Sequence, residues 1–176
     1  YAPIIFGCDG SQSIVAKKMG LYPNLQHKSA IAIRCYYKNV KDLTNQIELH
    51  FIDEVLPGYF WLFPCGKNVA NIGIGLSKEQ AKKDPRKLTE ILDDVINSNF
   101  FRARFKDSEK LETPKGWSLP LGKTKRTNHG NGFMLLGDAA GLIDPFTGEG
   151  IGNAMASAKI ATKIAKKCFE KNNFNK

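Results

Sequence analysis

Residues 135–158 hold the side chains of this sequence that are best suited to bind a ligand. A short apolar strand there runs into Gly137 and Asp138. In open α/β sheets, ligands bind just beyond the carboxyl ends of the strands. The Asp138 carboxylate can accept hydrogen bonds from ligand hydroxyl groups, such as those of a ribose or ribityl chain. We therefore expect Asp138 to be a ligand-binding residue.

Three glycines follow where a helix begins, at Gly148, Gly150 and Gly152. Glycine lets a backbone approach a flat ligand closely. The first N–H groups of a helix have no partner within the helix and carry partial positive charge. This helix start would therefore favour the negative charge that a reduced flavin bears around its N1 and O2 atoms. The alternative is a plain strand–turn–helix whose glycines only form the turn.

The whole string LLGDAAGLIDPFTGEGIGNAMASA, residues 135–158, resembles the second FAD motif of the p-hydroxybenzoate hydroxylase superfamily. More narrowly, it is similar to the geranylgeranyl reductase family. The resemblance implies that Asp138 binds the ribityl chain of FAD and that residues 145–152 lie against the isoalloxazine ring. The cofactor-binding residues implied in this segment are Gly137, Asp138, Pro145, Gly148, Gly150, Ile151 and Gly152.

A second string, GCDGSQS at residues 7–13, resembles the internal Asp-Gly motif of the same superfamily. The resemblance implies that Asp9 and Gly10 help to hold FAD and a nicotinamide donor, NAD(P)H. Ala16 and Lys17 stand where the family usually has Arg, so the choice between NADH and NADPH stays open. Taken alone, the string is also typical of a plain turn.

The string YFWLFP at residues 59–64 places three aromatic side chains on one face of a strand. Such a face can act as a wall for an apolar chain, and the glycines of GIG at residues 73–75 would leave space beside it. Ordinary packing in a sheet core is the alternative. Order and spacing resemble the YxWxFP…GxG pattern that lines the isoprenoid pocket of geranylgeranyl reductases. The resemblance implies these substrate-binding residues: Tyr59, Trp61, Phe63, Pro64, Gly73 and Gly75.

Alternation and turn signals predict the elements that must position these residues. We expect strands over residues 2–6, 30–38, 46–52, 59–63, 69–76, 117–121 and 133–136, with the first of them buried. In residues 46–52, Ile47, Leu49 and Phe51 share one face, with Glu48 and His50 on the other. The three neighbouring strands from residue 46 to residue 76 are joined by short turns and predict an antiparallel sheet.

Three helices complete the prediction. A short one covers residues 11–19, and a second begins at Asp84-Pro85, an N-cap followed by proline. The second helix buries one apolar stripe: Leu88, Ile91, Leu92, Val95 and Ile96. The third runs from about residue 150 to 169, and we expect its inward side chains to be Ile151, Ala154, Met155, Ala158, Ala161, Ile164, Ala165 and Cys168.

These features, with the resemblance, imply an α/β fold: part of a glutathione-reductase-like FAD-binding domain with an antiparallel-sheet substrate lobe. We expect residues 1–21 and 122–176 to belong to the FAD-binding domain and residues 22–121 to form the lobe. A GxGxxG loop for the FAD pyrophosphate is not found in the sequence. We therefore expect a chain truncated at both ends, and a fragment with only partial cofactor binding and no activity is one alternative.

Charge and cysteine content narrow the choice of partners. The chain has 26 basic and 17 acidic residues, a net charge of +9. Most of the excess lies in residues 78–106 and 159–176, which indicates solvated helix faces or attraction to an anionic membrane surface. Nucleic acid is not expected as a partner, because no basic–aromatic interleaving is present. Four scattered cysteines predict free thiols in a reducing compartment and no metal site.

The resemblance implies an FAD-dependent reductase that acts on carbon–carbon double bonds of a geranylgeranyl or polyprenyl group. Its partner would be a prenyl lipid or a prenylated small molecule. We expect a cytoplasmic location, with peripheral membrane contact as a further option. No apolar run approaches the roughly 20 residues of a membrane-spanning helix. A flavin monooxygenase or halogenase of the same superfamily is the alternative enzyme. Glu149 lies near the expected flavin site, although a solvated helix-start carboxylate is equally consistent.

Overall fold

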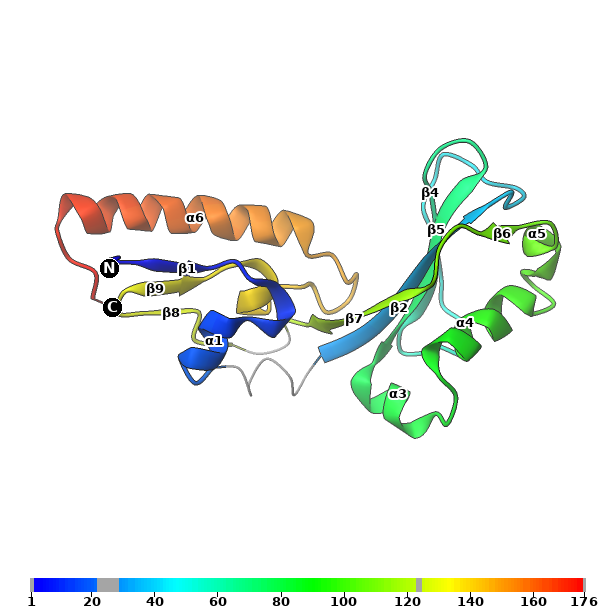
Figure 1. The fold of residues 1–176 in the computed structure, drawn as a ribbon, viewed down its shortest axis with the longest axis horizontal. Coiled ribbons are helices and arrows are strands. Elements are labelled where there is room, and N and C mark those ends of the chain that lie inside the picture. Colours follow the sequence, from blue (N-terminus) through cyan, green and yellow to red (C-terminus); the bar gives the residue numbers. More distant parts are fainter. Residues whose placement is uncertain (1, 22–28, 123–124, 176) are drawn as a thin grey trace. The chain divides into compact units, whose positions relative to one another are not determined.

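The structure, a computed structural model, describes residues 2–21, 29–122 and 125–175. The chain divides into two compact units. Unit 1 comprises Tyr1–Ser29 and Leu119–Lys176, and unit 2 comprises Ala30–Ser118. The predicted lobe boundary at residue 22 lies outside the described residues. Each unit has its own sheet (Figure 1).

Unit 2 is built on an antiparallel sheet with the strand order β3-β4-β5-β2-β6, and β7 also pairs with β2. Its strands are β2 (Ser29–Lys38), β3 (Glu48–His50), β4 (Tyr59–Pro64), β5 (Val69–Ser77), β6 (Glu109–Lys110) and β7 (Lys115–Pro120). In the register, Trp61 of β4 lies opposite Leu49 of β3 and Gly73 of β5. The antiparallel sheet predicted from the alternating strands is therefore confirmed.

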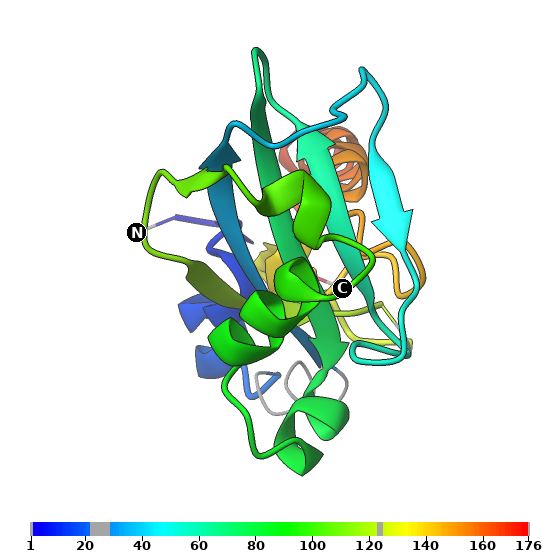
Figure 2. The same ribbon diagram turned by 90° about the vertical axis from the view of Figure 1, so that its right-hand side faces the viewer.

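One face of this sheet packs against helices that lie between β5 and β6 in the chain. The predicted apolar stripe of α4 (Leu88–Asn97) is confirmed, because Ile91, Leu92, Val95 and Ile96 are buried and Leu88 is partly buried. Phe101 and Phe105, at α5 (Arg102–Phe105), join the same core. Figure 2 shows α4 lying over the strands. Phe60 and Leu62 point into this core, so their neighbours on β4 face the other way.

The predicted start of α4 at Asp84-Pro85 is wrong. A separate helix, α3 (Lys78–Lys83), ends just before Asp84, and α4 begins at Leu88. The Asp84 carboxylate accepts hydrogen bonds from the backbone and side chain of Arg86. It therefore does not cap the helix. Glu90 Oε2 instead accepts the N–H of Lys87, 2.8 Å away, which satisfies a donor at the true helix start.

Unit 1 contains a small sheet with the order β1-β9-β8, in which β1 and β9 are parallel (Figure 1). The strands are β1 (Ile5–Gly7), β8 (His129–Gly130) and β9 (Phe133–Leu135), and the helices are α1 (Ile14–Lys18) and α6 (Ile151–Glu170). Two 3-10 turns follow the strands: η1 (Gly10–Gln12) and η2 (Gly137–Ala140). The prediction of a buried first strand is wrong, because Ile5 and Phe6 are exposed on an edge strand.

The inward face predicted for α6 is only partly correct. Ala161 and Ala165 are buried, and Ala154 and Cys168 are partly so. The residues of the predicted stripe that are exposed instead are Ile151, Met155, Ala158 and Ile164. α6 packs mainly against the η2 turn, so only a narrow side of this long helix is covered. Among the described residues, no helix is long and apolar enough to cross a membrane.

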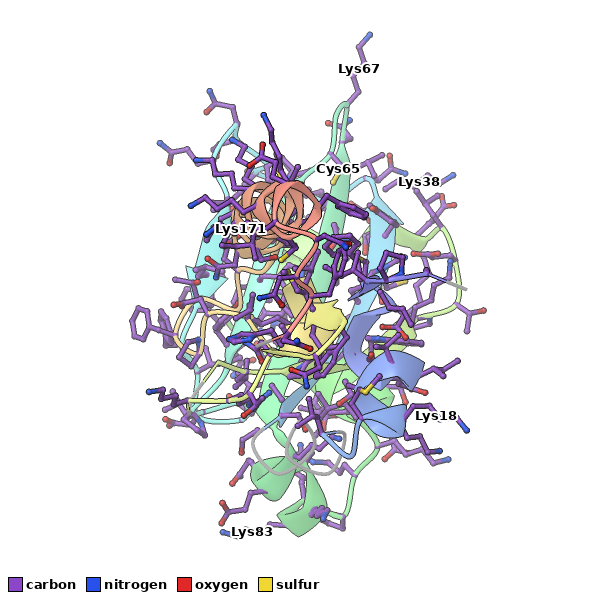
Figure 3. The ribbon with its side chains drawn as sticks, turned by 90° about the vertical axis from the view of Figure 1, so that its left-hand side faces the viewer. Lys18, Lys38, Cys65, Lys67, Lys83 and Lys171 are labelled. Carbon is purple, nitrogen blue, oxygen red and sulfur yellow. The ribbon has the colours of Figure 1, made fainter. Side chains whose placement is uncertain are left out.

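The basic residues of unit 2 are distributed over the surface and several are paired. Lys38 lies 2.8 Å from Glu109, and Lys83 lies 3.0 Å from Glu79. In Figure 3, Lys67 and Lys83 extend away from the ribbon rather than toward a common point. Of these residues Lys83 lies in the segment 78–106, and its exposed side chain fits the solvated helix face considered from the sequence.

Candidate cofactor and substrate sites

Asp138 lies in the η2 turn, directly after β9, as the sequence predicts for a carboxyl-edge ligand site. Its carboxylate is half-buried and accepts no hydrogen bond from the described part of the chain. Burial raises the pKa of Asp138 above its ordinary value of 3.8. An ionised carboxylate held in this way is destabilising unless donors reach it. Hydroxyl groups of a ligand are suitable donors, so this observation fits a ribityl chain.

Two glycines shape the surface around Asp138. Gly137 has a φ of +54°, and a Cβ atom there would lie 3.0 Å from the Cβ of Ala154. A Cβ atom on Gly150 would lie 3.1 Å from Ile143 Cγ1 and 3.5 Å from Asp138 Oδ1. Side chains at these two positions would crowd the carboxylate and the start of α6. The glycines thus keep backbone close to Asp138, which suits the close approach of a ligand.

The loop between η2 and α6 is held by Asp144, which the sequence analysis missed. Asp144 Oδ1 accepts hydrogen bonds from the N–H of Phe146, at 3.0 Å, and from the N–H and Oγ1 of Thr147, at 2.7 and 2.8 Å. Hydrogen bonds from Thr147 lower the pKa of Asp144. The Asp144-Pro145 dipeptide is a turn signal that could have revealed this role. Asp144 therefore sets the path of the segment that contains Pro145 and Gly148.

The start of α6 differs from the prediction of unpaired N–H groups. Glu149 Oε1 accepts the N–H of Gly152, so one of the expected donors is already satisfied. Glu149 therefore has the helix-start role that the sequence left open. Ile151, assigned to the cofactor by resemblance, is 80% exposed.

Two polar side chains of α6 that the sequence analysis missed fix the helix to the strand–turn segment. Asn153 Nδ2 donates to the carbonyl oxygen of Leu142 at 2.9 Å. Ser157 Oγ accepts the N–H of Gly137 at 3.1 Å. Both residues lie inside the string that resembles an FAD motif, but their roles depend on contacts that only the fold creates.

Asp9 and Gly10 lie in unit 1 with Asp138, and the η1 turn beside them contacts η2. Asp9 Oδ2 accepts the N–H groups of Ile14, at 2.7 Å, and Val15, at 3.2 Å. Burial raises the pKa of Asp9, but hydrogen bonds from Ser13 and these amides outweigh it and leave the pKa below 3.8. The carboxylate thus organises the start of α1. Its assignment to FAD and a nicotinamide stays a prediction.

Of the predicted substrate residues on β4, Tyr59, Trp61 and Phe63 lie on the face of the unit 2 sheet opposite α4, whereas strand alternation puts Pro64 on the α4 side. The ring centroids of Tyr59 and Trp61 are 6.2 Å apart, as are those of Trp61 and Phe63. Leu49 and Phe51 continue this apolar face and are 38% and 57% exposed. The alternation predicted for residues 46–52 is therefore present, with its apolar side on the open face. Exposed apolar residues gathered in this way indicate a binding surface.

Gly73 and Gly75 of β5 were both expected to leave space beside the aromatic row, but they differ in their surroundings. A Cβ atom on Gly73 would overlap the Trp61 indole, so the Trp61 ring itself occupies that space. At Gly75 a Cβ atom would lie 3.9 Å from Trp61 Cζ3, which is ordinary contact. Pro64 is the last residue of β4 and pairs with Ala70. The expectation that Gly73 leaves room for a ligand is thus wrong.

Comparison with known proteins identifies the family of this chain. The family model of the geranylgeranyl reductase catalytic domain matches residues 28–126. The chain therefore belongs to the geranylgeranyl reductase catalytic domain family. It is 36% identical to digeranylgeranylglycerophospholipid reductase 2 of Methanococcoides burtonii, over 96% of this chain and 40% of that protein. The chain thus spans less than half the length of such relatives.

Solved structures confirm the predicted α/β fold class. A geranylgeranyl bacteriochlorophyll reductase-like protein from Thermoplasma acidophilum has a TM-score of 0.83 and 27% identity, covering 99% of this chain and 43% of that one. A variant of the halogenase PltM in complex with FAD has a TM-score of 0.70 and 18% identity, covering 98% and 38%. At this lower identity the halogenase shows the fold alone.

Proposed function

We propose that the full-length protein is an FAD-dependent oxidoreductase that reduces carbon–carbon double bonds of a geranylgeranyl or related polyprenyl group. The observation that carries the proposal is the half-buried Asp138 carboxylate, which accepts no hydrogen bond from the described residues and lies beside Gly137 and Gly150. Membership of the geranylgeranyl reductase family supports the reaction class. The relatives named digeranylgeranylglycerophospholipid reductases support a prenyl lipid as the substrate.

The cofactor site is proposed from the chemistry of its residues. Asp138 would accept hydrogen bonds from the ribityl hydroxyls, while Gly137 and Gly150 would allow the backbone to approach the ring system. Asp144 would keep the segment from Pro145 to Gly148 in place. FAD bound there would supply hydride transfer, which protein side chains do not provide. We further propose NAD(P)H as the donor, with Asp9 and Gly10 close to its site.

The substrate site is proposed on the open face of unit 2. Tyr59, Trp61 and Phe63 offer an apolar surface, and Leu49 and Phe51 extend it. Burial of a prenyl chain there would be favoured by about 0.8 kcal/mol per CH2 group. A prenyl substrate resides in or near a bilayer, so we propose a cytoplasmic enzyme that contacts the membrane surface.

The proposal is tested by incubating the purified full-length protein, loaded with FAD, with NAD(P)H or dithionite and a geranylgeranylated glycerophospholipid. We expect mass spectrometry to show a gain of two hydrogens for each reduced double bond. Protein with the substitution Asp138→Ala serves as the control and should give little product. Oxygen consumption coupled to NAD(P)H oxidation, with no reduced lipid, would instead support a monooxygenase or halogenase activity and contradict the proposal.

A further inference from the structure

We propose that Asn71 is a positioning residue for the substrate surface, because it fixes the indole ring of Trp61 in one orientation. Trp61 Nε1 donates a hydrogen bond to Asn71 Oδ1 at 2.8 Å. Asn71 lies on β5 directly opposite Phe63 in the strand register, so its side chain is on the same face as the aromatic row. This inference rests on the proposed function, in which that row contacts the prenyl chain.

The indole is held on two sides. Its Nε1 edge is tied to Asn71, while its benzene edge lies over Gly73, where a Cβ atom would come within 2.7 Å of Trp61 Cη2. Without the hydrogen bond, the ring could turn about its side-chain torsions into other staggered rotamers. With it, the indole lies across β5 in a single pose. The bare backbone at Gly73 permits that pose and the Asn71 amide selects it.

The fixed pose matters because Trp61 stands in the middle of the aromatic row. Its plane is tilted by 33° from that of Phe63 and by 67° from that of Tyr59. Since the indole N–H is satisfied within the sheet, the ring presents apolar surface to a ligand. A surface that is already ordered does not lose side-chain freedom when the ligand binds. Asn71 therefore contributes to substrate affinity through Trp61 and not through its own contact.

Kinetics of the full-length enzyme with a geranylgeranylated substrate test this role. Asn71→Leu keeps a side chain of similar size but removes the acceptor, and we expect about a fivefold rise in KM, the effect of losing one hydrogen bond. The rate at which the electron donor reduces the flavin should stay unchanged. Asn71→Asp retains an acceptor for the indole N–H and should restore a KM nearer the wild-type value. As a matched control, Asn97→Leu changes an exposed asparagine of α4, on the opposite face of the sheet.

A double-mutant cycle separates the indirect role from a direct one. Phenylalanine at position 61 cannot donate to Asn71, so in protein that carries Trp61→Phe the further change Asn71→Leu should not raise KM again. If Asn71→Leu raises KM by the same factor in both backgrounds, Asn71 acts without Trp61 and the proposal is overturned.

A readout that needs no substrate keeps this inference distinguishable from the proposed function. The full-length protein is labelled with 5-fluorotryptophan, and the Trp61 resonance is assigned as the 19F line that Trp61→Phe removes. We expect one sharp line in the wild type and in Asn71→Asp, and a shifted or broadened line in Asn71→Leu. An unchanged line in Asn71→Leu would refute the positioning role. Absence of prenyl reduction by the wild type, with the line behaving as expected, would refute the proposed function alone.

Discussion

A Cβ atom on Gly150 would stand only 3.5 Å from Oδ1 of Asp138, so the start of α6 and this carboxylate border the same small space. Because Asp138 has no donor among the described residues, a cofactor that supplies hydroxyl groups would gain charge-assisted hydrogen bonds there. We expect Asp138→Ala to weaken FAD binding by about 2 kcal/mol, or about thirtyfold in Kd. Flavin absorbance of the purified full-length protein measures this. Asp53→Ala, at an exposed site, should leave flavin content unchanged.

Because burial raises the pKa of Asp138, the folding stability of the flavin-free protein should depend on pH. Burial raises the pKa of Asp138, so the folded state holds its proton to a higher pH than the unfolded chain does. Stability is therefore lost as the pH rises from the ordinary pKa of 3.8 through the folded pKa. Asp138→Asn removes this loss. We expect its Tm to exceed that of the wild type by a margin that grows over this range and then levels off; a constant margin would argue against the burial effect.

A substitution at Trp61 should affect the proposed substrate site and not the proposed cofactor site. Trp61→Ala removes the central ring of the aromatic row in unit 2, whereas the proposed cofactor residues belong to unit 1. We expect kcat/KM for a prenyl substrate to fall by about tenfold or more, while the FAD content changes little. Steady-state kinetics and flavin absorbance on the same preparation give both values. The reverse order of effects would place Trp61 at the cofactor.

Gly73 and Gly75 form a matched pair on β5. A Cβ atom on Gly73 would overlap both the Trp61 ring and the carbonyl oxygen of Ile33, whereas one on Gly75 meets only Trp61 Cζ3, at 3.9 Å. We expect Gly73→Ala to lower the free energy of unfolding by about 2 kcal/mol through overpacking. Gly75→Ala should be neutral or slightly stabilising, since alanine has less backbone entropy to lose. Chemical denaturation measures both, and equal effects would contradict this account.

Arg104 ties α5 to the strand edge of unit 2. Its Nη1 and Nη2 donate to the two carboxylate oxygens of Glu48 at 2.7 and 2.9 Å, and both side chains are partly buried. We expect Arg104→Gln to lower the free energy of unfolding by about 2 kcal/mol, with a smaller loss for Arg104→Lys. Thermal or chemical denaturation checks this. Lys83→Gln breaks an exposed pair and should have no measurable effect.

The Arg104 contribution also depends on pH. The hydrogen bond from Arg104 is the main cause that lowers the pKa of Glu48 below its ordinary value of 4.5. The stabilisation is therefore complete above pH 4.5 and is lost as the pH falls through the folded pKa. The difference in unfolding free energy between wild type and Arg104→Gln should shrink over that acidic range. If the difference in unfolding free energy stays the same at acidic pH, the charge of Glu48 is not what makes the Arg104–Glu48 pair stabilising.

Local pattern was enough to predict much of the fold. The alternation of residues 59–64 and the stripe of α4 reflect the periods of strand and helix, so both are visible along a single chain. Local pattern was not enough for Asp84. An Asp-Pro pair fits an N-cap, but the Asp84 carboxylate accepts hydrogen bonds from Arg86 instead. The helix begins further along, where Glu90 Oε2 accepts the backbone N–H of Lys87.

By itself, the sequence determined the strand and helix periods, the motif strings and hence the family, because these depend on residue type and spacing. The tertiary structure decided which face of each element is covered and which polar groups find partners. It filled the space at Gly73 with the Trp61 ring and left Ile151 exposed. Within the part of the chain that the structure describes, it also left the Asp138 carboxylate without a hydrogen-bond donor. These outcomes arise from contacts between residues far apart in the chain, which periodicity does not encode.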